Sequence, residues 1–254
     1  MAERQKGGRP KARLDTVVTD RGLAPSRERA RALILAGQVA VDGQVVSKAG
    51  APVAADARVE LAIPDHPYVG RGGVKLAHAL DVFSIDPTGR RALDVGASTG
   101  GFTDVLLQRG AASVIALDVG RGQLDHKLRS DPRVESLERT NVRHFELGER
   151  APYDLVTADV SFISLKVVLP RLRALVRPGG RLLVLVKPQF ELERRAAPKG
   201  VVRDPELRAR AVREVREAAE ALGLVALGES ESALAGPKGN REVFLLFRRQ
   251  PANP

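Results

Sequence analysis

The chain contains no cysteine and no tryptophan, and aromatic residues make up only 4% of it. The absence of cysteine excludes disulfides and thiolate metal sites. The four histidines are scattered without the spacing of a ligand cluster, so we expect no metal. Because aromatic side chains are so few, broad stacking on single-stranded nucleic acid is not expected either.

Long hydrophobic runs are also missing. No apolar stretch approaches the roughly 20 residues that cross a bilayer. The basic start, MAERQKGGRPKAR, is not followed by the apolar segment of a secretory signal. We therefore expect a cytoplasmic protein that does not insert into a membrane. Its 254 residues are enough for one large or two unequal domains.

Positive charge is abundant and concentrated near the N-terminus. The formal net charge is +10, and residues 1–31 carry nine of the basic side chains against four acidic ones. This excess predicts a polyanionic partner such as nucleic acid, although an arginine-rich codon bias would produce part of it. We expect residues 1–10 to form a basic tail.

A small module follows the tail. Ser26 is a typical N-cap, and Ala30, Leu33 and Ile34 have helical spacing, so a short helix presents a cationic face. Residues 39–41 and 45–46 then alternate as two strands around the turn Asp42–Gly43. The order resembles the S4 RNA-binding domain over residues 11–64. The alternative is that the charged helix face is simply solvated. The resemblance implies RNA contacts for five residues: Arg13, Ser26, Arg27, Arg31 and Lys48.

Proline and glycine interrupt the pattern at residues 65–73, where we place a linker. Beyond it, a helical segment near 74–83 precedes alternating strands and helices. This alternation predicts an α/β domain over residues 74–250, with a mostly parallel sheet covered on both faces. The expected strands lie near residues 92–94, 113–118, 153–158, 181–186, 224–230 and 242–247.

The most informative segment is ALDVGASTGGFTD, residues 92–104, a strand that ends near Asp94 and opens into a glycine-rich turn. The turn lacks the G-x-x-x-x-G-K-S/T pattern, which argues against a nucleoside triphosphate. Asp118 ends the next strand, about twenty residues later, where a ribose-binding carboxylate is expected. The pair predicts a nucleoside-bearing cofactor.

Charged residues close several of the predicted strands. Asp94, Asp118, Asp159 and Lys187 should meet at one edge of a parallel sheet. If the last strand runs antiparallel beside the fifth, Glu242 falls near Lys187, and Lys75 reaches the same edge from the preceding helix. Each lysine alone is more typical of a solvated charge. The set points to catalysis.

Five segments resemble the TlyA family: YVGRGGVKLAHAL, LDVGASTGGFTD, TADVSFISLKVVLP, LVKPQFE and GPKGNREVFLLF. That family, often labelled haemolysin, joins an S4 domain to a ribosomal RNA methyltransferase domain of the FtsJ type. The resemblance implies a Rossmann-like class I methyltransferase with a seven-stranded sheet. It also implies 2′-O-methylation of ribosomal RNA, on cytidine, with S-adenosyl-L-methionine as methyl donor.

The same resemblance implies roles for individual residues. The catalytic tetrad would be Lys75, Asp159, Lys187 and Glu242, and a basic loop near the RNA would carry Arg194, Arg195, Lys199 and Arg203. Ribosomal RNA or ribosomal subunits would be the partner. The cofactor would be held by Asp94, Gly96, Ala97, Ser98, Thr99, Gly100, Gly101, Phe102 and Asp118, with Asn141 beside its adenine.

We hypothesise that Lys187 accepts the proton of the 2′-hydroxyl. A lysine amine with its ordinary pKa near 10.4 is protonated at neutral pH. Partial burial and the nearby Lys75 ammonium would favour the neutral form of Lys187, while Asp159 and Glu242 orient the lysines. Phe162 and Phe190 either shelter the cofactor or the base, or simply pack beside the strand ends.

Three alternatives stay open at this point. A non-catalytic RNA-binding or ribosome-assembly factor would retain the fold with a decayed site. A pore-forming haemolysin would need a secretion signal and a membrane-active segment, and we find neither in the sequence. A base methyltransferase typically uses an Asn-Pro-Pro-Tyr-like or cysteine motif, and the chain contains neither.

Overall fold

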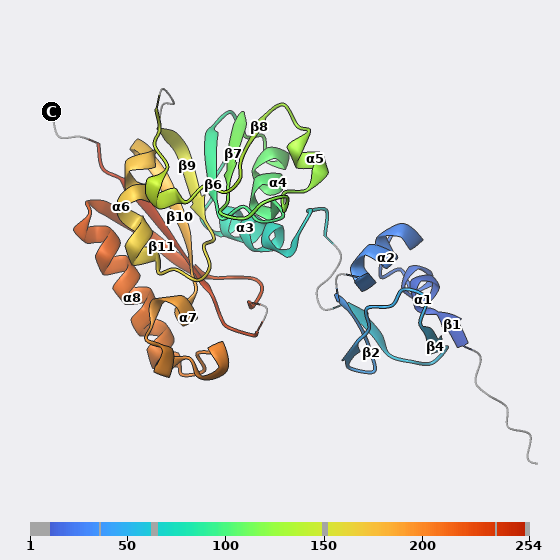
Figure 1. Cartoon of the computed structure of the whole chain (residues 1–254). Helices are drawn as coiled ribbons and strands as arrows, with labels where there is room; N and C mark the ends of the chain where they lie inside the picture. Colours follow the sequence, from blue (N-terminus) through green and yellow to red (C-terminus); the bar gives the residue numbers. More distant parts are fainter. Residues whose placement is uncertain (1–10, 36, 62–65, 149–151, 237, 252–254) are drawn as a thin grey trace, which may run out of the picture. The chain divides into compact units, whose positions relative to one another are not determined.

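The computed structural model describes residues 11–35, 37–61, 66–148, 152–236 and 238–251. It divides into two compact units between Pro67 and Tyr68, and each is treated by itself (Figure 1). The predicted tail, residues 1–10, and residues 62–64 of the predicted first domain lie outside the described part. Residues 71–73 of the predicted linker belong to a helix instead. Within the described residues, no helix is long and apolar enough to span a membrane.

The first unit packs two helices on short strands. Helices α1 (Leu14–Asp20) and α2 (Arg27–Leu35) cover a three-stranded sheet in the order β3–β2–β5, and a separate two-stranded pair joins β1 to β4. The strands are β1 (Lys11–Arg13), β2 (Val39–Val41), β3 (Gln44–Val45), β4 (Pro52–Ala54) and β5 (Val59–Leu61).

The predicted local signals of this unit are confirmed. The Ser26 hydroxyl accepts a hydrogen bond from the Arg29 amide at 3.1 Å, as an N-cap does. Asp42 and Gly43 both have positive φ, which the tight turn between β2 and β3 requires. Ala30, Leu33 and Ile34 are buried, so the helix face that they define packs into the core of the unit.

The second unit is built on a seven-stranded sheet in the order β11–β12–β10–β9–β6–β7–β8. Strands β10, β9, β6, β7 and β8 are parallel, while β12 is antiparallel to both of its neighbours. The strands are β6 (Arg91–Val95), β7 (Ser113–Leu117), β8 (Val134–Leu137), β9 (Tyr153–Ala158), β10 (Val176–Val186), β11 (Leu224–Glu231) and β12 (Val243–Arg249).

Helices cover both faces of this sheet (Figure 1). Helices α3 and α4 pack on one face and α6 and α8 on the other, each through its own apolar cluster. This is the predicted α/β architecture. The helical segments are α3 (Arg71–Val82), α4 (Gly101–Gln108), α5 (His126–Arg129), η1 (Val142–His144), α6 (Leu165–Leu175), α7 (Pro188–Glu191), η2 (Arg194–Ala196), η3 (Pro198–Gly200) and α8 (Pro205–Ala221).

Two strands differ from their predicted ranges. Strand β10 begins at Val176, five residues earlier than predicted, and its register with β9 shifts between Val176 and Arg181. The intervening Pro178, Gly179 and Gly180 conceal the early start in the sequence. Strand β8 was absent from the predicted ranges because it is a short edge strand with no fully buried side chain.

The packing of α3 on α4 depends on the absence of a side chain at Gly101. A Cβ there would lie 2.7 Å from the Gly73 amide nitrogen, which is a backbone atom that cannot rotate away. A Cβ on Gly72, in the first turn of α3, would come no closer than 3.4 Å to another atom, a Phe102 ring carbon.

We therefore expect G101A to lower the free energy of unfolding by about 1–3 kcal/mol, the usual cost of overpacking. G72A, the matched control, should be neutral or slightly stabilising because alanine favours the helix. Urea unfolding of both variants tests this, and equal stability of the two would contradict the packing explanation.

Candidate active site

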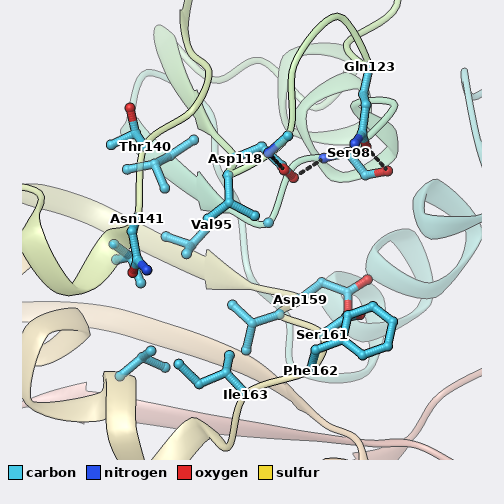
Figure 2. A pocket seen from close by; sticks show the side chains of 17 residues that line it. Val95, Ser98, Asp118, Gln123, Thr140, Asn141, Asp159, Ser161, Phe162 and Ile163 are labelled. Carbon is cyan, nitrogen blue, oxygen red and sulfur yellow. Dashed lines mark hydrogen bonds between the residues drawn. The ribbon is translucent and has the colours of Figure 1, made fainter.

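A cavity of about 580 Å³ opens at the carboxyl ends of β6, β7, β8 and β9 (Figure 2). Its wall is formed by the loops that follow these strands, with Gly96 and Ser98 on one side and Asp159, Ser161 and Phe162 on the other. The chain runs outward from β6 through β7 to β8 and then returns to β9 on the opposite side of β6. Ligands of open α/β sheets bind where the strand order reverses in this way.

Gly96 brings the two sides of this reversal together. Its φ is +83°, and a Cβ on it would lie 2.5 Å from the Asp159 carbonyl oxygen. A side chain at this position would therefore push the end of β9 away. Gly100 has a different role, because a Cβ there would collide with Leu124 and Leu128 rather than with the cavity.

Asp118 joins the glycine turn to the loop after β7. One carboxylate oxygen accepts the Ser98 amide at 2.8 Å, and the other accepts the Gly120 amide at 2.7 Å. The carboxylate lines the cavity, and each oxygen still has acceptor capacity. Figure 2 shows Asp118 and Ser98 across the cavity from Asp159 and Phe162. Asp118 therefore presents carboxylate oxygens to any ligand in the cavity.

The predicted cofactor residues divide into two groups. Gly96, Ser98, Asp118 and Asn141 line the cavity. The remaining predicted residues do not line it: Asp94, Ala97, Thr99, Gly100, Gly101 and Phe102. Several of these shape the turn from behind, since Phe102 is buried against the Phe244 ring and Thr99 faces Gly70.

Asp94 does not close its strand as predicted. It lies within β6 with no exposed surface, and its carboxylate accepts hydrogen bonds from Thr103 at 2.8 Å and Thr157 at 3.2 Å. Burial raises the pKa of Asp94 to about 7. The side chain thus links β6, β9 and α4 beneath the cavity.

The four predicted catalytic residues form two ion pairs. Lys75 Nζ lies 2.5 Å from Glu242 Oε2, and both side chains are almost completely buried. Lys187 Nζ lies 2.6 Å from Asp159 Oδ1 and donates a hydrogen bond to Ser161 Oγ at 3.0 Å. Asp159 and Ser161 also line the cavity. Lys187 is therefore tied directly to the cavity wall.

The antiparallel placement of the last strand is confirmed, since Val243 pairs with Val186. Glu242 consequently flanks Lys187 along the backbone, but its carboxylate bonds Lys75. Gly236 makes room for that carboxylate, because a Cβ on Gly236 would lie 2.5 Å from Glu242 Oε1. The charge of Lys75 is thus compensated by Glu242, which the sequence did not indicate.

Phe162 stands at the mouth of the cavity. It is 91% exposed, has a φ of +64°, and its ring centroid lies 5.2 Å from that of Phe190. A large apolar side chain exposed on a left-handed backbone is costly. Phe162 therefore packs on Phe190 beside the ends of β9 and β10 and also lines the cavity.

Two of the predicted RNA-binding residues of the first unit, Arg13 and Arg27, pair with a buried acid. Asp15, with no exposed surface, bonds Arg13 at 2.8 Å and lies 3.4 Å from Arg27 Nε. These guanidinium groups hold the pKa of Asp15 well below its usual range. Ser26 caps α2, and Arg31 and Lys48 are exposed.

The predicted basic loop of the second unit leads from α7 to α8. Arg194, Arg195, Lys199 and Arg203 are all exposed there. Arg195 lies 3.6 Å from Glu193 Oε1. The loop therefore begins just after α7, the short helix that directly follows Lys187.

Three residues that sequence reasoning missed hold the loops of the site. Ser161 follows Asp159 by two positions and contacts Lys187. The buried Glu191 accepts the Leu165 amide at 2.8 Å and the Ser164 hydroxyl at 2.6 Å, and burial raises its pKa. Asn240 bonds the backbone of both Gly200 and Val202. Glu191 and Asn240 act across 26 or more positions, which no local pattern reveals.

Comparisons with known proteins agree with this geometry. The FtsJ-like methyltransferase family model matches residues 68–249, and the S4 domain model matches residues 12–59. The chain is 49% identical to the 16S/23S rRNA (cytidine-2′-O)-methyltransferase TlyA of Mycobacterium tuberculosis, covering 94% of this chain and 91% of the relative. It is 37% identical to hemolysin A of Brachyspira hyodysenteriae, covering 92% and 99%.

A solved structure from Streptococcus thermophilus, named as a hemolysin, matches with a TM-score of 0.75 and 37% identity, covering 96% of this chain and 90% of that one. The fold and the two family matches define a methyltransferase domain joined to an S4 domain. Within that class, the chain belongs to the TlyA family. The resemblance found in the sequence is confirmed.

The buried Asp94 carboxyl makes stability depend on pH. An unfolded aspartate ionises near pH 3.9, whereas the folded protein keeps the proton up to about pH 7. Between these values the folded state binds more protons than the unfolded state, so stability falls as pH rises.

D94N lacks this titration. We expect the free energy of unfolding of the wild type, relative to D94N, to fall between about pH 4 and 7 and then level off. Urea unfolding over a pH series measures it, and parallel curves would contradict the assignment.

Proposed function

We propose that the protein transfers the methyl group of S-adenosylmethionine to the 2′-hydroxyl of a cytidine in ribosomal RNA. The main support is one residue: Asp159 lines the cavity and is also the ion-pair partner of Lys187. A ligand in the cavity is thereby held next to the lysine. Membership of the TlyA family supports the same substrate, since relatives are named as rRNA (cytidine-2′-O)-methyltransferases.

The residues of the cavity suit S-adenosylmethionine. The volume of the cavity, about 580 Å³, falls in the usual range for small-molecule sites. Asp118 offers carboxylate oxygens for ribose hydroxyls, and Asn141 lines the cavity beyond it, where an adenine would lie (Figure 2). When bound, the cofactor supplies an electrophilic methyl group on a positively charged sulfonium. Asp159 then contributes a negative charge to the cavity wall.

The chain's residues have to orient the nucleophile and take its proton. Lys187 would accept the 2′-hydroxyl proton, while the bound cofactor would supply the methyl group to the ribose oxygen. An ammonium cannot do this, so Lys187 has to release a proton to solvent beforehand. The proton it takes up restores the ammonium, which Asp159 and Ser161 stabilise in the observed geometry.

The Lys75–Glu242 pair supports this arrangement from the neighbouring strand. It is nearly closed to solvent, so it keeps the start of β12 and the first half of α3 in fixed positions. Removing one member would leave an uncompensated buried charge. We assign Lys75 to orienting the ribose hydroxyl and Glu242 to holding Lys75.

The exposed Phe162 ring provides an apolar surface where the substrate nucleotide enters. A nucleotide within paired RNA has to leave its stack to bring the 2′-hydroxyl into line with the methyl group. The rings of Phe162 and Phe190 are placed to contact its base. Binding of the remaining RNA rests on arginine and lysine contacts to phosphates, so we expect it to depend steeply on salt.

Incubation with labelled S-adenosylmethionine and separated ribosomal subunits tests the proposal. The wild type should label one or both ribosomal RNAs at a cytidine ribose, as mapped by mass spectrometry. K187A should reduce the rate at least 100-fold, because a general base typically contributes 10²- to 10⁴-fold.

K166A is the matched control for K187A. Lys166 is also partly exposed and paired with a carboxylate, Glu214, but that carboxylate, unlike Asp159, does not line the cavity. Calorimetry should show cofactor affinity within about twofold of wild type for both variants, as expected when only the proton-transfer step is affected. Full activity of K187A would refute its role. Failure of the wild type to bind the cofactor would instead support a non-catalytic RNA-binding factor.

Asp118 allows a separate test of the cofactor site. D118A should weaken S-adenosylmethionine binding at least tenfold, since a hydrogen bond to a charged group contributes about 1.5–3 kcal/mol. D86A is the matched control, because Asp86 also accepts the amide two residues ahead but lies outside the cavity. Calorimetry measures both, and equal affinities would exclude Asp118 as a cofactor contact.

A further inference from the structure

A second groove, of about 530 Å³, lies along the edge strand of the sheet in the second unit. One wall is the part of α8 from Pro205 to Arg216, with Arg208 and Arg213, and the other is the end of β11 together with Arg241. The groove lies at the same end of the strands as the four predicted catalytic residues. Arg241 directly precedes Glu242, and Glu231, at the end of β11, pairs with Val243.

The groove carries an excess of positive charge. It contains four arginines and two glutamates, Glu229 and Glu231. Arg216 pairs with Glu229, and Arg241 lies 3.3 Å from Glu231, so both acids are neutralised. Arg208 and Arg213 make no ion pair or side-chain hydrogen bond with any residue that the structure describes. Two guanidinium groups are thus left to face an external ligand.

These two arginines are not needed to hold α8 in place. The helix packs through Ala211, Val212, Val215 and Ala219. Its polar attachment to the preceding loop is made by Arg210, which lies 2.8 Å from Glu193 and 3.6 Å from Glu214. Solvation alone would not require arginines to converge on a groove.

We propose that this groove binds the phosphodiester backbone of the RNA strand that carries the target nucleotide, with Arg208 and Arg213 contacting phosphates. The proposal rests on the proposed function. Guanidinium groups match phosphate oxygens in geometry and charge. The groove ends beside Glu242, and the basic loop of Arg194, Lys199 and Arg203 leads into the start of α8. A strand in the groove is therefore directed toward the catalytic edge.

The test compares the full-length R208A/R213A double variant with R181A/R248A. Arg181 and Arg248 are cross-strand neighbours in the same unit, and Arg248 lies near the end of β12, whereas the groove lies at its start. The control removes the same charge far from the groove. R208K/R213K, which keeps the charge, reports whether any loss comes from charge or from altered packing. Calorimetric S-adenosylmethionine affinity and unfolding curves should match wild type for all three.

RNA affinity is measured with naked ribosomal RNA and with whole subunits over a series of salt concentrations. Loss of two phosphate contacts should weaken R208A/R213A at least tenfold near 0.1 M salt and reduce the slope of log affinity against log salt by about 1.5. The control should keep the wild-type slope, and R208K/R213K should recover most of the affinity.

Three results would overturn the inference. One is a wild-type slope for R208A/R213A, and another is an equal loss in R181A/R248A, which would indicate only a general effect of net charge. The third is weaker binding to subunits but not to naked RNA, which would make an acidic protein segment the partner of the groove. If the wild type itself labels no ribosomal RNA, the proposed function fails instead, and that result is recognised without any variant.

Discussion

The close approach of β6 and β9 at their carboxyl ends is the constraint on which the site depends. The Asp159 amide donates to the Val95 carbonyl at 2.9 Å, and Gly96 passes the Asp159 carbonyl at a distance that no side chain would permit. The backbone of the glycine turn is therefore in direct contact with the backbone of Asp159, whose carboxylate is one of the four groups proposed to be catalytic. Asp118 extends this contact to β7 through Ser98. The cavity exists because three loops are held together at one reversal of strand order.

Charge at the catalytic edge is arranged in pairs. Lys75 and Lys187 each pair with a different carboxylate. The two pairs differ in exposure, since Lys75 and Glu242 are almost completely buried, while Asp159, the partner of Lys187, lines the cavity. A buried pair is costly unless both charges stay together. The inner pair accordingly joins the start of β12 to α3 and holds Lys75 in position, whereas the outer pair includes a carboxylate of the cavity wall. Along β11 the pattern differs, because arginines outnumber the acids that could neutralise them.

Much of the fold could be predicted because its signals are local. Helix α2 was indicated by Ser26 and three apolar residues at helical spacing, and the turn after β2 by Asp42–Gly43. The strand ends were visible as apolar runs closed by Asp118, Asp159 or Lys187. Strand β8 was harder, because an edge strand without a fully buried face has a weak pattern. The early start of β10 was concealed by the glycines and proline of its irregular stretch.

The class of the protein, its S4 and methyltransferase modules and the four residues expected to be catalytic could all be predicted from the amino-acid sequence, since they depend on residue type and order. Only the tertiary structure decided which carboxylate pairs with which lysine, that Asp94 lies in the interior, and that Glu191 and Asn240 hold distant loops. The physical reason is that hydrogen bonds and ion pairs act over about 3 Å between atoms. Residues such as Lys75 and Glu242, 167 positions apart, come within that reach only after the sheet has formed.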